Sequence, residues 1–316
     1  MVFWGVNRRA ASRTGIGICR GRAGGSFALV RDGQGADRPV LLDYGPLAAT
    51  DENPQPSPFS QVIRRHKLQG APAVLVMAGG DYQLLQIDMP ELSTEERREA
   101  ARWQIRDMID FQVAEAIVDL FDVLPYGGDR KPLTYAVTAR QSLLRSGLDS
   151  VLSADLKPSI IDIPEFALRN IADLYAEESR GVGILYLQAE SGLLTIAREG
   201  VLYLSRSFPF GMDCLMPYVD SNLEALTEQV DAIVLEIQRS FDYCESTFHL
   251  PMVSKLLVAQ TEREIPVVTN YLADFLATDV QPLCLETVLE LPEGHNQLEL
   301  NRYLLAIGGA LRREDD

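Results

Sequence analysis

The stretch from Gly181 to Ser207, GVGILYLQAESGLLTIAREGVLYLSRS, decides the fold of this chain. Its apolar runs are separated by turns that contain glycine, so it predicts three consecutive β-strands. The expected strands are Gly181–Leu187, Leu193–Arg198 and Val201–Ser207. The first half opens in the same way, because Gly15-Ile-Gly-Ile18 corresponds to Gly181-Val-Gly-Ile184 and heads its own hairpin sheet. This recurrence predicts a duplicated architecture.

The elements after the second opening alternate between helix and strand. A long helix is predicted by apolar residues spaced by three and four, with Ser221 and Glu224 as its capping box. The apolar stripe consists of Leu223, Leu226, Val230, Ile233, Val234, Ile237, Phe241 and Cys244. The later elements are strand Lys255–Ala259, helix Val267–Leu276, strand Val280–Leu285 and helix Gln297–Arg312. This order is typical of an α/β domain.

The first half has the same plan with one addition. Its main elements are expected at Gly15–Cys19, Ser26–Arg31, Pro39–Tyr44, Ala73–Ala78, Tyr82–Met89, Ser159–Ile163 and Pro164–Ala176. A compact extra unit interrupts them, with a helix from Ser93, strands Ile117–Leu124 and Leu133–Thr138, and helix Gln141–Leu152. We therefore expect an α/β protein of the actin-like (actin and sugar-kinase) superfold, with two duplicated domains and an inserted small subdomain. The expected boundaries are a tail over 1–14, a first domain over 15–92 plus 157–180, the insert over 93–156 and a second domain over 181–316.

The charge balance restricts the class of partner. The chain has 316 residues, with 29 Lys and Arg against 45 Asp and Glu and a formal net charge of -16. A surface of this sign repels phosphate backbones, so nucleic acid is not expected as a partner. The one basic stretch has Arg8, Arg9 and Arg13 after Phe3 and Trp4. It is interpreted as a solvated segment, with contact to anionic lipid as the alternative.

The lengths of the apolar runs and the spacing of the cysteines indicate the cellular compartment of the protein. No run approaches the roughly 18 residues that a membrane span needs, and the start of the chain lacks a signal-peptide pattern. A cytoplasmic location is therefore expected. The four cysteines, Cys19, Cys214, Cys244 and Cys284, are scattered without metal-ligand or redox spacing. They are predicted to be small buried apolar residues.

A series of motifs runs in order along most of the chain. The motifs are Ser93-Thr-Glu-Glu-Arg-Arg-Glu-Ala-Ala-Arg-Trp-Gln104, Ile109-Asp-Phe111, Val118-Asp-Leu-Phe121, Tyr135-Ala-Val-Thr-Ala-Arg140, Ile161-Asp-Ile-Pro-Glu-Phe-Ala-Leu168 and Glu236-Ile-Gln-Arg-Ser-Phe-Asp-Tyr243. In this order they resemble the PilM family of type IV pilus assembly proteins. The resemblance covers the chain from about Gly15 to Arg312. It implies an FtsA-like cytoplasmic assembly scaffold docked under the inner membrane.

The resemblance also implies a binding site. In PilM-like proteins the inserted subdomain and the adjacent first domain form a groove for the short cytoplasmic tail of a PilN-like inner-membrane protein. In this chain the groove would involve Glu99, Arg102, Trp103, Arg106, Phe111, Tyr135 and Arg140. Trp and Arg often carry the energy of small interfaces, and the alternative is that Trp103 is a core residue of the insert. Other pilus assembly components and an assembly ATPase are further candidate partners.

The expected fold raises the question of ATP with magnesium as a cofactor. In actin-like ATPases two hairpin turns hold the phosphates. Here Gly17 and Leu187 stand where such proteins usually place Asp, so magnesium-dependent hydrolysis is not expected. The candidate nucleotide-binding residues are Gly17, Gly192, Glu236, Arg239, Ser240, Gly308 and Gly309. The alternatives are an exposed ion pair for Glu236 and Arg239, and close helix packing for Gly308 and Gly309.

Other catalytic classes have little support. The chain has no P-loop, dinucleotide-binding or nucleophile-elbow motif. His66, His249 and His295 fall in separate elements, and Asp162 with Glu165 is interpreted as a structural pair. No catalytic or metal-binding residue is therefore assigned. Besides the scaffold, two functions stay open: an active actin-like ATPase or small-molecule kinase, and a filament-forming cytoskeletal protein.

Overall fold

The computed structural model describes residues 13–21, 24–33, 37–47, 58–90, 92–127, 131–175, 180–251 and 253–313, so the basic residues before Arg13 lie outside it. The strands are β1 (Thr14–Gly21), β2 (Gly24–Arg31), β3 (Val40–Leu47), β4 (Pro72–Val76), β5 (Tyr82–Ile87), β6 (Ala116–Val123), β7 (Leu133–Arg140), β8 (Lys157–Asp162), β9 (Val182–Leu187), β10 (Gly192–Arg198), β11 (Val201–Phe208), β12 (Lys255–Gln260) and β13 (Asp279–Pro282). The helices are α1 (Pro58–Arg65), α2 (Thr94–Ile105), α3 (Gln141–Ser153), α4 (Pro164–Asp173), α5 (Met212–Leu215), α6 (Leu223–Phe248), α7 (Pro266–Phe275), α8 (Gln297–Arg302) and α9 (Leu304–Ala310). Short 3-10 turns lie at Val113–Glu115, Met216–Tyr218 and Leu285–Thr287.

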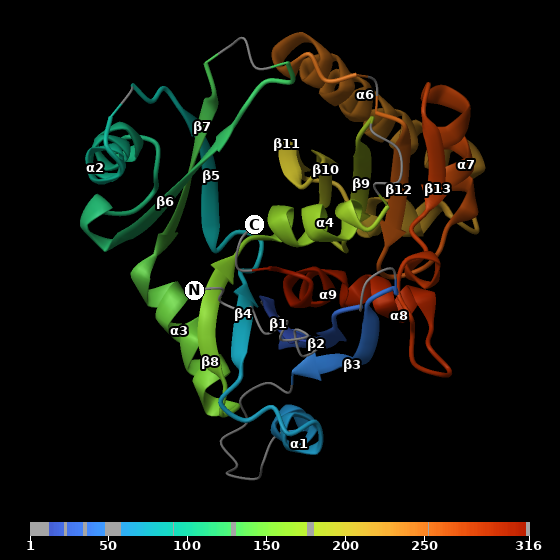
Figure 1. Cartoon of the computed structure of the whole chain (residues 1–316). Coiled ribbons are helices and arrows are strands. Elements are labelled where there is room, and N and C mark those ends of the chain that lie inside the picture. Colours follow the sequence, from blue (N-terminus) through green and yellow to red (C-terminus); the bar gives the residue numbers. More distant parts are fainter. Residues whose placement is uncertain are drawn as a thin grey trace, which may run out of the picture.

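Two five-stranded sheets share one topology (Figure 1). The first has the order β3-β2-β1-β4-β8 and the second the order β11-β10-β9-β12-β13. In each, the first three strands along the chain pair antiparallel, and the last two continue the sheet in parallel. The duplicated α/β architecture predicted from the two Gly-x-Gly-Ile openings is therefore confirmed.

The helices α4 and α9 lie between the two sheets (Figure 1). All seven residues of α9 are buried, and most of α4 is buried as well, as expected for helices covered on every side. Glycines allow α9 to approach β1 and α4 closely. A Cβ atom at Gly17 would overlap the carbonyl oxygen of Ala306, and one at Gly308 would overlap that of Ala167.

The outer faces of the sheets are covered unequally. Helices α1 and α3 pack on the first sheet, and α6 with α7 packs on the second (Figure 1). The buried stripe of α6 contains Leu226, Val230, Ile233, Val234, Ile237 and Cys244, as the periodicity predicts. The prediction is wrong for Leu223, the first residue of the helix, which is 61% exposed, and Phe241 is only half-buried. The cap differs from the predicted box. Asn222 accepts the hydrogen bond from the Ala225 N–H, while the Ser221 hydroxyl bonds to the Pro217 carbonyl.

A third sheet, β5-β7-β6, stands beside the first half, and α2 covers one of its faces. Ser93 caps the start of α2, as predicted, and it also forms a capping box with Glu96. The sequence predicts the strand at Tyr82 within the first domain, but β5 pairs with β7 in this separate sheet. The sequence also predicts one helix over Gln297–Arg312, which the structure breaks at Tyr303. No helix among the described residues has the length and hydropathy needed to cross a membrane.

Candidate functional site

A cleft of about 450 Å³ opens where the third sheet meets the two halves of the molecule. One wall is β6, and the facing wall is β8 with the start of α4. The β10–β11 turn and the end of the chain after α9 complete the lining. The lining residues are 119–123, Val137, 160–163, Phe166, Arg169, 200–202 and Arg312.

Both walls of the cleft are edge strands. β6 is the last strand of the third sheet and β8 the last strand of the first sheet, and neither has a second strand partner in the described parts of the chain. An edge strand presents a row of backbone N–H and C=O groups. Consecutive residues of each strand line the cleft, so both backbones are within reach of an occupant. This geometry suits an extended peptide that adds to a sheet edge.

Aromatic and charged side chains form the floor of the cleft. The Phe166 ring meets the Phe121 ring edge-on, with centroids 4.9 Å apart. The guanidinium groups of Arg169 and Arg312 lie 5.0 and 5.7 Å from the Phe166 centroid. Arg312 Nε is also 3.7 Å from an oxygen of the buried Asp162. At the rim, Ile161 and Val201 are 41% and 38% exposed. The cleft therefore offers apolar contacts next to fixed charges.

A buried carboxyl group joins three parts of the molecule beside this cleft. The Tyr82 hydroxyl from β5 donates to Glu165 Oε2 at 2.6 Å, and the Ser205 hydroxyl from β11 donates to Oε1 at 3.3 Å. Burial raises the pKa of Glu165 above its ordinary value, although the hydrogen bonds from Tyr82 and Ser205 act in the opposite direction. Asp162 instead accepts a hydrogen bond from the Ile163 N–H at the end of β8, which is a structural role.

The β6–β7 hairpin attaches the third sheet to the second half. The Tyr126 N–H donates to the Phe248 carbonyl at 2.7 Å, at the end of α6. The buried Arg198 donates to the Tyr126 hydroxyl at 3.1 Å and lies 4.0 Å from the centre of its ring. The wall formed by β6 is therefore tied to the second half through Tyr126, just beyond the C-terminal end of the strand.

The structure divides the predicted groove residues between two faces of the third sheet. Glu99, Arg102 and Trp103 belong to α2 and Arg106 caps its C-terminal end, on the face of the sheet away from the second half. Trp103 is 71% exposed, so the alternative of a core residue does not hold, and the Arg106 guanidinium stacks 5.4 Å from its ring.

The remaining predicted groove residues are Phe111, Tyr135 and Arg140. Tyr135 faces the opposite side of the sheet and stacks on Phe121 with centroids 5.3 Å apart. Phe111 lies 4.9 Å from the guanidinium of Arg140. None of the predicted set lines the cleft itself. Sequence reasoning missed Phe121 and Phe166 as floor residues, although both occur in the quoted motifs.

The predicted nucleotide residues are not brought together in one cavity. Gly17, Gly308 and Gly309 lie in the close packing of the central helices, and a Cβ at Gly192 would overlap the Phe208 ring. On α6, Glu236 bonds to Arg206 and Arg239, and the buried Ser240 donates to the Glu236 carbonyl. These contacts are those of packing and ion pairs, and the nucleotide role of these residues stays a prediction.

The β9–β10 turn is closed by the polypeptide itself. The carbonyl oxygens of Gln188 and Ala189 accept hydrogen bonds from the N–H groups of Met212 and Asp213, at 2.7 and 2.8 Å. A turn that holds phosphate must instead present N–H groups to the ligand. Within the described ranges, no cluster of three or more His, Cys, Asp or Glu side chains is suited to a metal ion. Burial raises the pKa of the Cys19 and Cys244 thiols to about 12, while Cys214 and Cys284 are half-buried.

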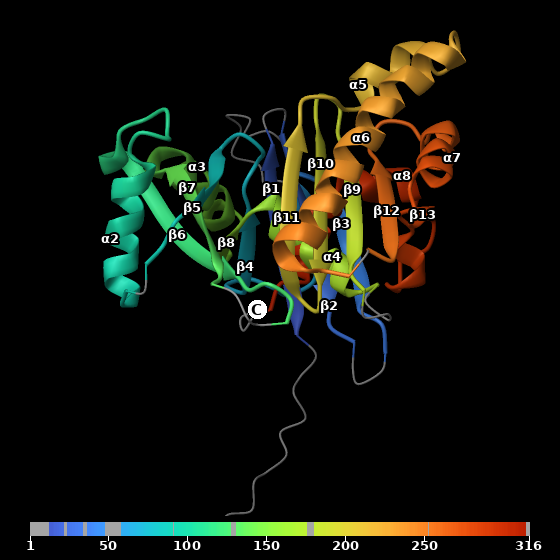
Figure 2. The same cartoon turned by 90° about the horizontal axis from the view of Figure 1, so that it is seen from above.

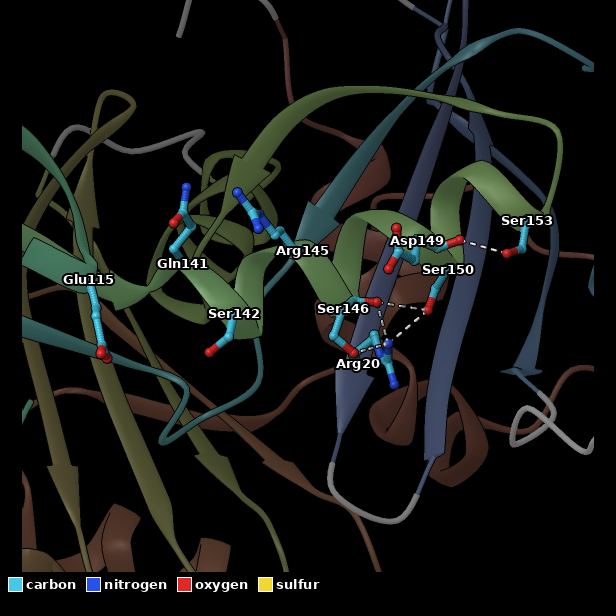
Figure 3. A pocket seen from close by; sticks show the side chains of 9 residues that line it. All are labelled: Arg20, Glu115, Gln141, Ser142, Arg145, Ser146, Asp149, Ser150 and Ser153. Atoms are coloured by element: carbon cyan, nitrogen blue, oxygen red, sulfur yellow. Dashed lines mark hydrogen bonds between the residues drawn. The ribbon is translucent and has the colours of Figure 1, made fainter.

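A second, shallower depression of about 660 Å³ lies along α3 (Figure 3). Arg20 from β1 donates to the Ser146 carbonyl at 2.6 Å and to the Ser150 hydroxyl at 2.8 Å. Arg20 and Arg145 share this surface with Glu115 and Asp149, so no net charge accumulates. The contacts of Arg20 fasten the end of β1 to α3, which is a structural role.

Comparison with known proteins identifies the fold class. No family model matches the chain, and no curated protein matches it in sequence. Among solved structures, a PilM–PilN type IV pilus biogenesis complex is similar with a TM-score of 0.67 and 19% identity, over 95% of this chain and 98% of that one. The cytoplasmic domain of EpsL, an inner-membrane component of the Vibrio cholerae type II secretion system, has a TM-score of 0.47 at 9% identity, over 92% and 94% of the chains. A Bacteroides thetaiotaomicron protein with an actin-like ATPase fold has the same TM-score and identity, over 93% and 96%.

The class of protein follows from the topology and this likeness. The duplicated five-stranded sheets with a central helix pair define the actin-like fold, and the predicted fold class is confirmed. The similarity to the PilM–PilN complex extends over nearly the whole of both chains.

Proposed function

We propose that this protein is an actin-like scaffold of a type IV pilus assembly complex, which binds the cytoplasmic tail of a PilN-like inner-membrane protein. The observation that carries the proposal is a fold similar to that of a PilM–PilN complex over 95% of the chain, together with a cleft lined by two edge strands. In this role the protein works in the cytoplasm, at the face of the inner membrane, and reaches the membrane through its partner.

The tail occupies the cleft between β6 and β8 as an extended segment. Backbone hydrogen bonds to a free strand edge supply affinity, and alternate side chains of the tail enter the apolar part of the cleft. Phe121, Ile161 and Val201 provide that apolar surface. The tail therefore carries bulky apolar residues at every second position.

The experiment is a calorimetric titration with a synthetic peptide of the cytoplasmic tail of the PilN-like protein from the same pilus system. Ile161→Glu and Val201→Glu should each raise Kd at least about tenfold, because they place a carboxylate where an apolar side chain docks. Leu152→Glu is the matched control, because Leu152 is an exposed apolar residue on α3 and does not line the cleft. This variant should leave Kd unchanged. A tail that fails to bind the folded wild-type protein would overturn the proposal.

The pilus type is a finer part of the proposal. The ordered motifs in the sequence resemble those of MshI, the PilM relative of mannose-sensitive haemagglutinin (MSHA) pilus biogenesis. We therefore assign the protein to an MSHA-type system. Removing the protein from a bacterium that carries such a system should abolish MSHA pili. Normal piliation would contradict the MSHA assignment. The scaffold role is tested separately, by binding of the tail peptide.

Nucleotide titration separates the scaffold from an actin-like ATPase whose nucleotide state switches partner binding. The turn at Gln188 and Ala189 is closed by α5, so calorimetry with Mg-ATP and with Mg-ADP should give no heat of binding up to millimolar concentration. Binding at micromolar strength would favour the switched ATPase.

A further inference from the structure

An apolar stripe lies exposed on the outside of the second half. On α7, Val267, Tyr271 and Phe275 follow one another at helical spacing, and Val267 and Phe275 are 37% and 54% exposed. The rings of Tyr271 and Phe275 pack against each other with centroids 4.5 Å apart. On α6, Leu235 is 51% exposed. We name these four residues the α6–α7 stripe.

The two helices lie side by side, as both Figure 1 and Figure 2 show. The Tyr271 hydroxyl donates to Asp231 at 2.7 Å, and the Gln238 amide donates to the Phe275 carbonyl at 3.3 Å. Leu235 falls between Asp231 and Gln238 on the same face of α6, so it borders α7. The opposite faces of both helices are buried in the core, for example at Ile233 and Leu272. Folding therefore does not require the stripe to be apolar.

Carboxylates share the face of α6 that carries Leu235. At helical spacing these are Glu224, Glu228, Asp231 and Asp242, and α7 carries Asp274. The only basic residue on the two helices is Arg239, which pairs with Glu236. The nearby Arg263 pairs with Asp220 through two hydrogen bonds. The surface is thus apolar along its centre and strongly negative at its rim.

We propose that the α6–α7 stripe is a docking site for a basic amphipathic helix of a protein partner. A stripe of exposed apolar side chains across two neighbouring helices suits the apolar face of a third helix, and Lys or Arg beside that face meet the carboxylates. The charge excludes other occupants. Two copies of this face would bring acids against acids, and anionic lipid or nucleic acid would be repelled. The site is separate from the β6–β8 cleft and is independent of tail binding.

The test uses a synthetic leucine–lysine amphipathic helix of about five turns as the probe. Calorimetry should detect saturable binding that weakens as salt rises, because screening reduces the attraction between the charges. Leu235→Glu and Phe275→Glu should each raise Kd at least about tenfold, as expected for central contacts. Leu152→Glu on α3 is the matched control, since this leucine is equally exposed but lies outside the stripe.

Three outcomes would overturn the proposal. The first is failure of the probe to bind. The second is equal binding by the α6–α7 variants and the wild type, which would place the probe elsewhere. The third is self-association of the wild-type protein that Leu235→Glu abolishes in analytical ultracentrifugation, since the occupant would then be a second copy. A leucine–glutamate helix of the same pattern should not bind.

Discussion

The two halves of the molecule have the same sheet and differ in what connects its last two strands. In the second half a single helix, α7, joins β12 to β13. In the first half the path from β4 to β8 contains the third sheet, α2 and α3. The shared parts build the core around α4 and α9, while the candidate cleft exists only where the halves differ. The duplicated sheets therefore build the fold, whereas the insert between β4 and β8 creates the candidate binding site.

The outer layers differ as well. The 26-residue α6 covers the second sheet, whereas α1 and α3, with 8 and 13 residues, cover the first. A longer continuous apolar stripe buries more surface, so we expect the second half to be the more resistant to local opening.

The largest expected effect tests the buried face of α6. Ile233→Asp should lower the free energy of unfolding by about 4 kcal/mol or more, because an unpaired carboxylate would enter the core. The matched change Leu235→Asp, two residues away on the exposed face, should cost less than about 1 kcal/mol. Urea unfolding followed by circular dichroism measures both. Similar losses for the two variants would mean that the faces of α6 are assigned wrongly.

The next prediction concerns the packing that the halves share. Gly308→Ala should destabilise the protein by about 3 kcal/mol, because its Cβ would overlap the backbone of α4 at Ala167. Gly79→Ala is the control, since a Cβ there meets no atom within 4 Å. Thermal unfolding of both variants decides the point. A neutral Gly308→Ala would show that α4 and α9 can separate, and so would reopen a ligand-binding role for Gly308.

A smaller effect is expected at the joint between the halves. The pKa of Glu165 is raised by burial from its ordinary value of 4.5, so the folded state holds this proton more tightly than the unfolded state does. Its contribution to stability is therefore complete below pH 4.5 and is lost as the pH rises through the raised pKa. Glu165→Gln cannot titrate, and the stability of wild type relative to this variant should fall over that interval.

Urea unfolding of both proteins at a series of pH values measures this difference. Tyr82→Phe is a useful companion variant, because it removes the hydrogen bond at 2.6 Å that favours the ionised carboxylate and should steepen the fall. Parallel stability profiles for wild type and Glu165→Gln would contradict the predicted role of burial.

The smallest expected effect tests whether the tail binds in the β6–β8 cleft or on the outer face of α2. Trp103→Ala should change the free energy of unfolding by less than about 0.5 kcal/mol, because the side chain is mostly exposed. It should also leave binding of the PilN-like tail unchanged, since Trp103 lies on α2 and not in the cleft. A clear loss of tail binding would move the groove to the outer face of α2.

Much of the fold could be predicted from local patterns. The stripe from Leu226 to Cys244, the Ser93 cap and the two Gly-x-Gly-Ile openings are all short-range signals, and each appears in the structure. The residues of the candidate cleft could not be predicted from such short-range patterns. Trp103 and Phe121 both belong to the resembling motifs, but only the pairing of β6 with β7 shows that they lie on opposite sides of one sheet.

The sequence by itself determined the duplicated α/β plan, the insertion in the first half and the buried face of α6, because helix and strand periodicity are properties of neighbouring residues. Tertiary structure alone decided that β5 joins the third sheet, that β6 and β8 are the outermost strands of their sheets and line one cleft, and that Gly308 packs against Ala167. These features depend on contacts between residues far apart in the chain. Their geometry follows from how sheets and helices pack around a common core, which no local pattern contains.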